Sequence, residues 1–517
     1  MDTSPQRGSF SAGLRRENLS RMSEEGFDIL VIGGGITGAG IAREATYRGF
    51  RVALVEKDDF ASGASGRSTR LIHGGLRYLE QMQLRLVFEA SRERRILLRI
   101  APHLVRPLPI LLPITRRSPH SYTKVAAGMW MYDLLALFRN VERHRMLRPA
   151  DVARMEPILG GSDLDGAAYF YDATADDSRL TLATVLSAHE AGAVVANHAE
   201  AVGLIREGSR VAGGVVRDGI DGSERVVRAR LVVNACGPWA DQIQDSGGGG
   251  KGQRRLRLSK GVHVNVPRAR LPLRQAVAMT SPTDGRLMFA VPDGAFAYAG
   301  TTDTPYEEDP DRVAADASDV AYILEALNAS FPGCRITEED VISAWAGLRP
   351  LIDRDARNTY ETSREHAIWE SAPGLLTIAG GKLTTYRAMA CDLLRAAEPH
   401  IRAAGARPKG VRDTARTLLP ETPEGAAGSS SEGSSLGPFP AWEGVDRAVG
   451  GEMALTLCDV LIRRTRIFYE APDQGVSLAA EVASRIGLAL NWDEAERRRQ
   501  VALYEAEVAL SRAWRKG

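Results

Sequence analysis

The chain has 517 residues, more than one hydrophobic core usually supports, so we expect two or three domains. The 66 Lys and Arg residues nearly balance the 65 Asp and Glu residues, and bulk charge therefore gives no reason to expect a nucleic-acid partner. The four cysteines are far apart and form no C-x-x-C pair, which argues against a metal centre or a disulfide framework. Such cysteines suit a reducing, cytoplasmic compartment.

The first 25 residues are polar and contain no apolar core of the kind that a signal peptide has, so we expect a disordered tail there. Elsewhere, no run approaches the ~20 apolar residues that a membrane-spanning helix needs. Any membrane contact of this chain is therefore expected to be peripheral.

A dinucleotide-binding pattern follows at residues 28–56, which read DILVIGGGITGAGIAREATYRGFRVALVE. An apolar strand leads into Gly33, Gly35 and Gly38, a helix of small residues follows, and a second strand ends in Glu56. In this motif the glycines permit a tight turn, leave room for a pyrophosphate and let the helix pack on the strand. The helix N-terminus attracts the phosphates, and the acid accepts a hydrogen bond from the ribose.

FAD, NAD and NADP all bind to this fingerprint. An enzyme that reduces a flavin with a nicotinamide usually has a second nucleotide fold, and the sequence contains only one full G-x-G-x-x-G. If the dinucleotide is FAD, we expect the electrons to come from a substrate and to leave to an acceptor other than a nicotinamide.

The segments that follow predict a mixture of helices and strands. Residues 84–100 have the pattern of an amphipathic basic helix, and prolines make an irregular segment the expectation for residues 102–119. Residues 125–137, VAAGMWMYDLLAL, favour a buried helix, with a membrane-facing surface as the alternative. Short alternating strands over residues 258–302 predict an antiparallel sheet, and residues 422–437 have the Gly/Ser-rich composition of a linker.

Two later glycine turns, at residues 234–239 and 380–385, also follow strand-like runs. Because strand ends in open α/β sheets converge on a ligand crevice, both turns are expected near the dinucleotide. Four cations stand in apolar or glycine-rich surroundings, and together in one pocket they would bind an anionic substrate. These cations are Arg77, Arg349, Arg364 and Lys382.

Seven motifs in order carry a resemblance to a known family: GGGITGAGIA, LIHGGLRYLE, NACGPWAD, KGVH, GTTDT, AGLRPL and AGGKLTTYR. Together they resemble the FAD-dependent, quinone-linked glycerol-3-phosphate dehydrogenases of the D-amino-acid-oxidase-like flavoprotein superfamily. The resemblance covers about residues 28–419, and CDVLIRRTRIFYE extends it more weakly into the C-terminal region.

The resemblance implies an α/β fold (α+β overall) with a Rossmann-like FAD-binding domain, an antiparallel-sheet substrate domain and a small helical C-terminal domain. The FAD-dependent region would span residues 26–400, a linker residues 401–450 and the C-terminal domain residues 451–517. Within the first region, FAD-binding segments near 26–84, 165–257 and 340–400 would alternate with substrate-domain segments near 85–164 and 258–339.

The implied reaction is oxidation of sn-glycerol 3-phosphate to dihydroxyacetone phosphate, with a hydride passing from C2 to FAD and electrons passing on to a membrane quinone. An oxidase of the same substrate that uses oxygen is the alternative, and a non-catalytic flavin-fold binding module is the alternative of another class. The resemblance also implies peripheral attachment to the cytoplasmic face of a membrane, and a homodimer is possible.

Site residues follow from the matching motifs. His263, Arg349 and Lys382 are the expected catalytic residues; for His263 a base and a satisfied structural histidine both remain open. The residues expected to bind substrate are Arg77, Tyr78, His263, Arg349, Arg364, Lys382 and Thr384. The residues expected to bind FAD are Gly33, Gly35, Ile36, Thr37, Gly38, Glu56, Ser68, Thr69, Gly237, Gly381, Lys382, Leu383 and Thr384.

Overall fold

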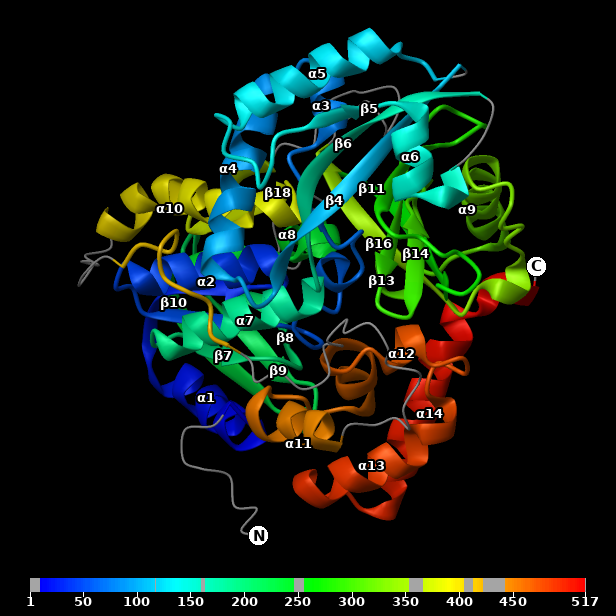
Figure 1. Cartoon of the computed structure of the whole chain (residues 1–517). Helices are drawn as coiled ribbons and strands as arrows, with labels where there is room; N and C mark the ends of the chain where they lie inside the picture. Colours follow the sequence, from blue (N-terminus) through cyan, green and yellow to red (C-terminus); the bar gives the residue numbers. More distant parts are fainter. Residues whose placement is uncertain are drawn as a thin grey trace.

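Two β-sheets and a C-terminal group of helices organise the molecule (Figure 1). The structure is a computed structural model that describes residues 10–116, 118–159, 163–245, 255–352, 366–403, 412–421 and 442–516. The sequence-based expectation of a mixed α/β fold with a Rossmann-like domain, an antiparallel sheet and a helical C-terminal domain is confirmed.

The first sheet is the nucleotide-binding sheet. Its central strands are parallel and run in the order β18 (Leu375–Gly380), β10 (Glu224–Asn234), β1 (Gly26–Ile32), β2 (Val52–Val55) and β7 (Val194–Ala196). Antiparallel strands extend it: β17 (His366–Ala372) beside β18, and β9 (Arg210–Asp218) with β8 (Ala199–Glu207) beside β10. Strand β1 is buried on both faces over Ile29–Ile32, as that apolar run predicts.

Helices cover both faces of this sheet. Helices α2 (Ile36–Tyr47), α7 (Asp177–Glu190) and α10 (Tyr386–Ala403) pack on the face that carries Ile29 and Val31. Helix α1 (Ala12–Glu24) packs on the opposite face, against the side of β1 that carries Leu30.

The expectation of a disordered tail over residues 1–25 is wrong for the helical part, residues 12–24. Two polar side chains of α1, Arg15 and Asn18, face inward and find partners there. Arg15 donates to the carboxylate of Asp218 at 2.6 Å, and the Asn18 amide donates to the Val195 carbonyl at 2.9 Å. The polar sequence led us to expect an exposed segment. In the fold these polar side chains form hydrogen bonds with buried polar groups.

The second sheet is antiparallel except where β12 meets β4, as the alternating strands of residues 258–302 predicted. Its main path is β15 (Thr304–Tyr306), β11 (Leu256–Pro267), β14 (Phe296–Gly300), β13 (Leu287–Asp293), β12 (Ala276–Thr280), β4 (Val105–Thr115), β6 (Leu164–Ala175) and β3 (Leu71–Ile72). Strand β16 (Ser343–Ile352) pairs with β11, and β5 (Arg145–Leu147) pairs with β6. We expected β6 and β16 within FAD-binding segments, and both strands belong to the second sheet.

Strand β4 also corrects the expectation of an irregular segment at residues 102–119. Its prolines, Pro107, Pro109 and Pro113, occupy alternate positions, so their missing N–H groups all face the same neighbour. The strand pairs with β6 along its whole length but with β12 only at Ile110 and Leu111. The sparsely paired side tolerates residues without a donor.

Helices α3 (Leu76–Glu80), α4 (Leu84–Ile100) and α5 (Tyr122–Leu135) lie together at one end of the second sheet, with α6 (Pro149–Met155) and α9 (Ala317–Ser330) elsewhere on it (Figure 1). The favoured interpretation of residues 125–137 as a buried helix is wrong. Helix α5 buries only Met129, Tyr132 and Asp133, and it leaves Trp130 and Leu134 about half exposed.

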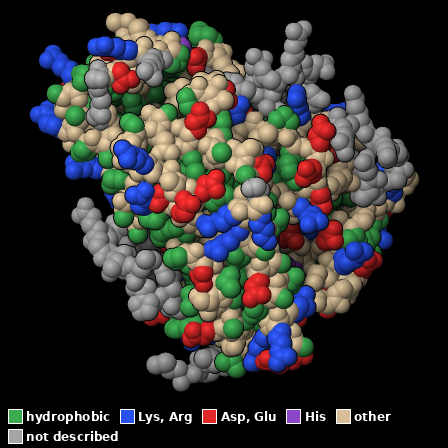
Figure 2. All heavy atoms as spheres, turned by 90° about the vertical axis from the view of Figure 1, so that its right-hand side faces the viewer, with side chains coloured by type: hydrophobic (Ala, Val, Ile, Leu, Met, Phe, Trp, Pro, Cys, Tyr) green, Lys and Arg blue, Asp and Glu red, His purple; other side chains and the backbone are tan. Residues whose placement is uncertain are grey.

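The C-terminal domain consists of α11 (Trp442–Gly451), a π-helical turn η7 (Asp459–Arg464), α12 (Ile467–Glu470), α13 (Val476–Leu490) and α14 (Glu494–Ser511). The expected linker over 401–450 is wrong at residues 412–421, where Leu419 is buried and its N–H bonds the Ile100 carbonyl at 2.6 Å, and at α11. Residues 422–437 lie outside the described residues. Across the middle of the face in Figure 2, Lys and Arg side chains alternate with Asp and Glu side chains, in keeping with the balanced composition.

We expect Arg15→Met to reduce the free energy of unfolding by about 3–5 kcal/mol, because it removes one partner of a buried ion pair and leaves Asp218 inside. Thermal or denaturant unfolding measures the change. Arg16→Met, at an exposed position of the same helix, is the matched control and should change stability by less than about 0.5 kcal/mol. Equal stability of the two variants would contradict the packed position of α1.

Candidate active site

The glycine turn between β1 and α2 has the shape of a pyrophosphate cradle. Gly33 has a φ of +109°, and a Cβ there would lie 2.6 Å from the Ala235 carbonyl oxygen. A Cβ at Gly38 would collide with the Gly33 carbonyl, so the helix can approach the strand only with glycine at position 38. A Cβ at Gly35 would point at the hydroxyl of Ser65, which already accepts the Ile36 N–H at 2.9 Å.

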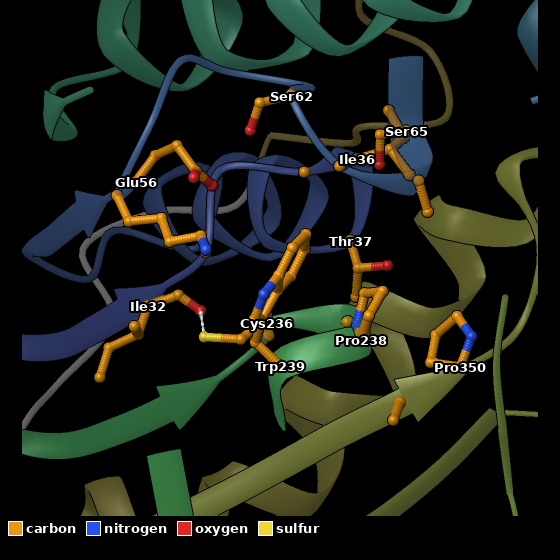
Figure 3. A pocket seen from close by; sticks show the side chains of 18 of the residues that line it. Ile32, Ile36, Thr37, Glu56, Ser62, Ser65, Cys236, Pro238, Trp239 and Pro350 are labelled. Carbon is orange, nitrogen blue, oxygen red and sulfur yellow. Dashed lines mark hydrogen bonds between the residues drawn. The ribbon is translucent and has the colours of Figure 1, made fainter. Parts of the chain in front are cut away.

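An elongated cavity lies over this turn (Figure 3). Glu56 lies at one end of the view and Pro350 at the other, with Thr37 and Trp239 between them. Of the residues expected to bind FAD, those that line this cavity are Gly33, Gly35, Ile36, Thr37, Glu56, Ser68, Gly237, Gly381, Lys382 and Leu383.

Glu56 is the acid at the ribose position. Its carboxylate accepts the Gly34 N–H at 2.6 Å and the Asp58 N–H at 3.1 Å. Burial, reinforced by the nearby charge of Asp58, raises the pKa of Glu56 to about 7. The group therefore titrates near neutral pH, and donors from a ligand would favour its charged form.

Sequence reasoning missed several residues of this cavity. Ser62 and Ser65 come from the loop ASGASGRST, whose small polar residues were a usable signal. Trp239 is the last residue of the predicted turn at 234–239, and the Lys57 ammonium lies 4.3 Å from the centre of its ring. Lys57 also pairs with Asp311 of the second domain, a contact that only the fold reveals.

These residues fit FAD. The cavity is lined from Glu56 at one end to the turn at Gly380 and Gly381 at the other. One wall is the N-terminus of α2, where Gly35 has no side chain that would keep a phosphate away. At the other end Gly380 and Gly381 have φ values of 80° and 77°, which brings backbone groups rather than side chains to the cavity. A pyrophosphate at the first turn would place the flavin ring near the second.

A second cavity of about 200 Å³ adjoins the first and shares the turn at Gly380–Leu383. It gathers most of the residues that the sequence predicted for substrate. The predicted residues that line it are Ser68, Thr69, Tyr78, His263, Arg349, Gly381, Lys382, Leu383 and Thr384. The side chain of Arg77 and the whole of Arg364 lie outside the described residues, so their predicted roles stay predictions.

His263 is buried between aromatic and cationic neighbours. Its ring stacks on Trp345 with centroids 5.1 Å apart, and its Nε2 lies 2.9 Å from the Thr69 hydroxyl. Burial, together with Arg349 and Arg70, holds the pKa of His263 well below its usual value. The imidazole is therefore neutral at physiological pH. Its Nδ1 is buried and hydrogen-bonded to no described residue.

Arg349 reaches the cavity from β16 across β11. A Cβ at Gly261 would collide with its guanidinium, so the glycine of the KGVH motif makes room for it. Arg349 donates to the Thr301 hydroxyl at 2.8 Å and to the Thr302 carbonyl at 3.1 Å. Asp303 lies 3.5 Å away, so the arginine is held in place from one side.

Lys382 and Thr384 come from the second glycine turn. The Lys382 ammonium lies 3.3 Å from the centre of the Tyr78 ring, a cation–π contact that fixes both side chains. The Thr384 hydroxyl accepts the backbone N–H of His73 at 3.2 Å. The turn therefore ties the nucleotide-binding sheet to the LIHGGLRYLE segment.

The comparisons with known proteins agree with the cavity. A family model described as "FAD dependent oxidoreductase" matches residues 28–387, and one described as "C-terminal domain of alpha-glycerophosphate oxidase" matches residues 439–497. Fold, glycine turns and match together define the chain as an FAD-dependent oxidoreductase, and its cofactor is FAD.

Curated relatives narrow the family. The "Glycerol-3-phosphate dehydrogenase 2" of Mycobacterium tuberculosis is 40% identical over 528 residues, covering 94% of this chain and 89% of the relative. The "Aerobic glycerol-3-phosphate dehydrogenase" of Staphylococcus saprophyticus is 41% identical over 383 residues, covering 74% of this chain and 69% of the relative. The chain belongs to the family of FAD-dependent glycerol-3-phosphate dehydrogenases.

Solved structures give the same result. The glycerol-3-phosphate dehydrogenase of Bacillus halodurans complexed with FAD superposes with a TM-score of 0.77 at 32% identity, covering 97% of this chain and 98% of that one. An L-alpha-glycerophosphate oxidase of Mycoplasma pneumoniae with FAD bound has a TM-score of 0.60 at 16% identity, covering 77% of this chain and 100% of that one, which indicates a shared fold.

We expect FAD to bind the apoprotein more tightly as pH rises toward and through 7, with a plateau above. A ribose hydroxyl that donates to Glu56 favours the charged form, so binding lowers a pKa that is about 7 beforehand. Below that pH the affinity should fall by up to about tenfold per pH unit. Fluorescence titration of FAD between pH 5.5 and 8.5 measures the slope. Glu56→Gln is the control; a slope that persists in Glu56→Gln assigns the titration to another group.

Proposed function

We propose that the protein oxidises sn-glycerol 3-phosphate to dihydroxyacetone phosphate and passes the electrons to a quinone in a membrane. One observation supports the substrate most strongly: His263, Arg349 and Lys382 line one small cavity that shares its glycine turn with the FAD cavity. A cavity with an arginine and a lysine suits a small anion, and the adjoining cofactor suits an oxidation.

The chemistry divides among few groups. FAD, when bound, supplies the acceptor for the hydride that leaves C2. Arg349 binds the phosphate, and binding energy from that distant charged group holds C2 in place. Lys382 provides positive charge at the turn of residues 380–383, where it would stabilise negative charge that develops on the bound cofactor. Arg77 and Arg364 are proposed as further phosphate ligands.

The hydroxyl proton needs a base. His263 is the proposed group because it lines the substrate cavity, its imidazole is neutral and its Nδ1 is hydrogen-bonded to no described residue. Its depressed pKa makes it a weak base, and the contact with Thr69 is also what a structural histidine makes. Both roles stay open.

The electron acceptor is a separate part of the proposal. The match of residues 439–497 to the C-terminal domain of alpha-glycerophosphate oxidase favours oxygen as a second candidate acceptor. Hydrogen peroxide formation in air, measured beside the rate with a quinone analogue, separates the two.

The membrane contact is proposed at the surface of α4 and α5, which we call the α4–α5 surface. Among described residues no helix is both long and apolar enough to span a bilayer. The α4–α5 surface exposes Phe88, Trp130, Leu134, Leu137 and Phe138, and its exposed arginines are Arg85, Arg92, Arg95, Arg99 and Arg139. Apolar side chains inserted among anionic headgroups and arginines near them would hold the enzyme on a cytoplasmic membrane face. Homodimer formation remains a separate proposal.

Anaerobic mixing with sn-glycerol 3-phosphate should bleach the flavin band of the wild-type protein. Arg349→Met should retain FAD and lose about 2–5 kcal/mol of transition-state binding, which is on the order of 30- to 5000-fold in kcat/KM. Arg270→Met, at an exposed arginine of the same domain, is the matched control and should keep wild-type kinetics. A flavin that stays oxidised with this substrate rejects the proposed reaction, and wild-type kinetics in Arg349→Met remove that residue from the site.

The protein should float with anionic liposomes at low salt and detach as salt increases, because the arginines are screened. The double variant Leu134→Asp/Phe138→Asp should lose most of this binding. Leu488→Asp is the matched control, since Leu488 is 76% exposed but belongs to the C-terminal domain. Failure of the wild type to float at low salt, with full activity on a water-soluble acceptor, would count against membrane docking and favour oxygen.

A further inference from the structure

One loop lines both cavities. Residues 59–70, which we call the flavin loop, run from the end of the first βαβ unit to the second sheet. Ser62 and Ser65 line the FAD cavity, Arg67 and Thr69 line the substrate cavity, and Ala64 lines both. The position of this loop therefore determines the shape of both cavities.

The C-terminal domain holds the first end of the flavin loop. The Asp59 carboxylate accepts Arg463 Nε at 2.7 Å and the two terminal nitrogens of Arg464 at 2.7 and 2.8 Å. Asp59 is fully buried, and the Arg464 side chain is 1% exposed. Both arginines stand in the π-helical turn η7, a geometry that is uncommon and often marks functional sites.

The same domain also reaches the second end of the flavin loop. Arg466 forms an ion pair with Asp293 and donates to its Oδ1 at 3.3 Å. The Asp293 carboxylate in turn lies 3.5 Å from the Arg70 guanidinium. The Arg70 guanidinium lies 4.9 Å from the ring centre of Tyr469, again from the C-terminal domain, and 5.1 Å from that of Trp345. Arg70 is thus fixed between that domain and the aromatic ring on which His263 stacks.

At the first end of the flavin loop the charged side chains already form ion pairs with one another. Asp59, His198 and Asp459 lie close enough together to suggest a metal site. However, both oxygens of Asp59 already accept arginine donors, and Asp459 binds His198 at 2.9 Å and Arg463 at 2.6 Å. The cluster therefore fixes the relative position of two domains.

Between its two ends the flavin loop contacts the second sheet and the C-terminal domain: Tyr298 donates to the Thr69 carbonyl at 3.1 Å, and Arg67 lies 3.4 Å from Glu507 of α14. The Ser65 hydroxyl accepts the Ile36 N–H at the N-terminus of α2, and the Ser68 N–H bonds Asp177 at 2.8 Å. A displaced end would move Ser62 and Ser65 relative to the glycine turn that receives the pyrophosphate. Ion pairs that themselves touch no ligand can therefore control cofactor binding.

We propose that Arg463, Arg464 and Arg466 are positioning residues for FAD: they hold both ends of the flavin loop and so make the C-terminal domain part of the cofactor site. None of the three lines the FAD cavity or the substrate cavity. The proposal depends on FAD as the cofactor and is independent of the substrate and of the electron acceptor.

The test compares four variants of the full chain as apoproteins. Arg463→Met is the mild one, because Arg464 still pairs with Asp59 and the domain stays folded. Arg464→Lys and Arg466→Lys keep the charge but lose the planar fork. Arg485→Met is the matched control, since Arg485 pairs with Asp446 on the exposed side of the same domain. The FAD dissociation constant, hydrogen exchange of residues 60–70 and the melting temperature are measured for each.

We expect the first three variants to weaken FAD binding about tenfold or more and to speed hydrogen exchange in the flavin loop, with Arg485→Met within twofold of wild type. A lower melting temperature with unchanged FAD affinity and unchanged exchange in Arg463→Met would show a merely structural role and overturn the proposal. If a lysine variant does not fold, Arg463→Met still decides the question.

Discussion

Asp59 is a carboxylate with no exposed surface, and such a charge is tolerated only when cations surround it. Two guanidinium groups from a domain 400 residues further along the chain meet that need. The nucleotide-binding domain is therefore complete only when the C-terminal domain is docked, and the flavin loop that begins at Asp59 depends on the docking. The same logic recurs nearby, where Arg179 binds the buried Glu452 with both terminal nitrogens at 2.7 and 2.8 Å.

The parallel strands of the nucleotide-binding sheet bring three glycine turns to one edge of that sheet. Ile32, Asn234 and Thr377 lie in one row across β1, β10 and β18. The turns after β1 and β10 therefore lie side by side, β18 runs three residues further to Gly380, and Gly33, Gly237 and Gly381 line one cavity. This part of the site was predictable from the sequence, because strand ends and glycines mark it locally and parallel strands impose the rest.

Other parts were not predictable, for a common physical reason. The partner of Arg15 is 203 residues away and the partner of Asp59 is 405 residues away, so a local pattern of polar residues cannot show that they are buried. Polarity suggested a tail at α1, and prolines suggested an irregular segment at β4. In both cases tertiary partners, an ion pair in one and a sparsely paired strand edge in the other, override the local preference. For α5 the error had the opposite sign, because its apolar run suggested a buried helix that is in fact partly exposed. The Tyr132 hydroxyl donates to Asp172 at 2.7 Å, and this bond determines which face of α5 is buried and leaves Trp130 exposed.

The electrostatics of the substrate cavity follow from the same buried cations. Burial lowers the pKa of His263, Arg349 and Arg70 lower it further, and Arg349 faces the substrate cavity as the proposed phosphate ligand. A bound dianion would offset that positive field, and by reciprocity the pKa of His263 would rise toward its ordinary value. An imidazole that is neutral before the anion arrives and more basic afterwards is suited to take a proton only when substrate is present. Because Arg70 belongs to the flavin loop and is held through Asp293 by Arg466, the C-terminal domain also contributes to the charge that His263 experiences.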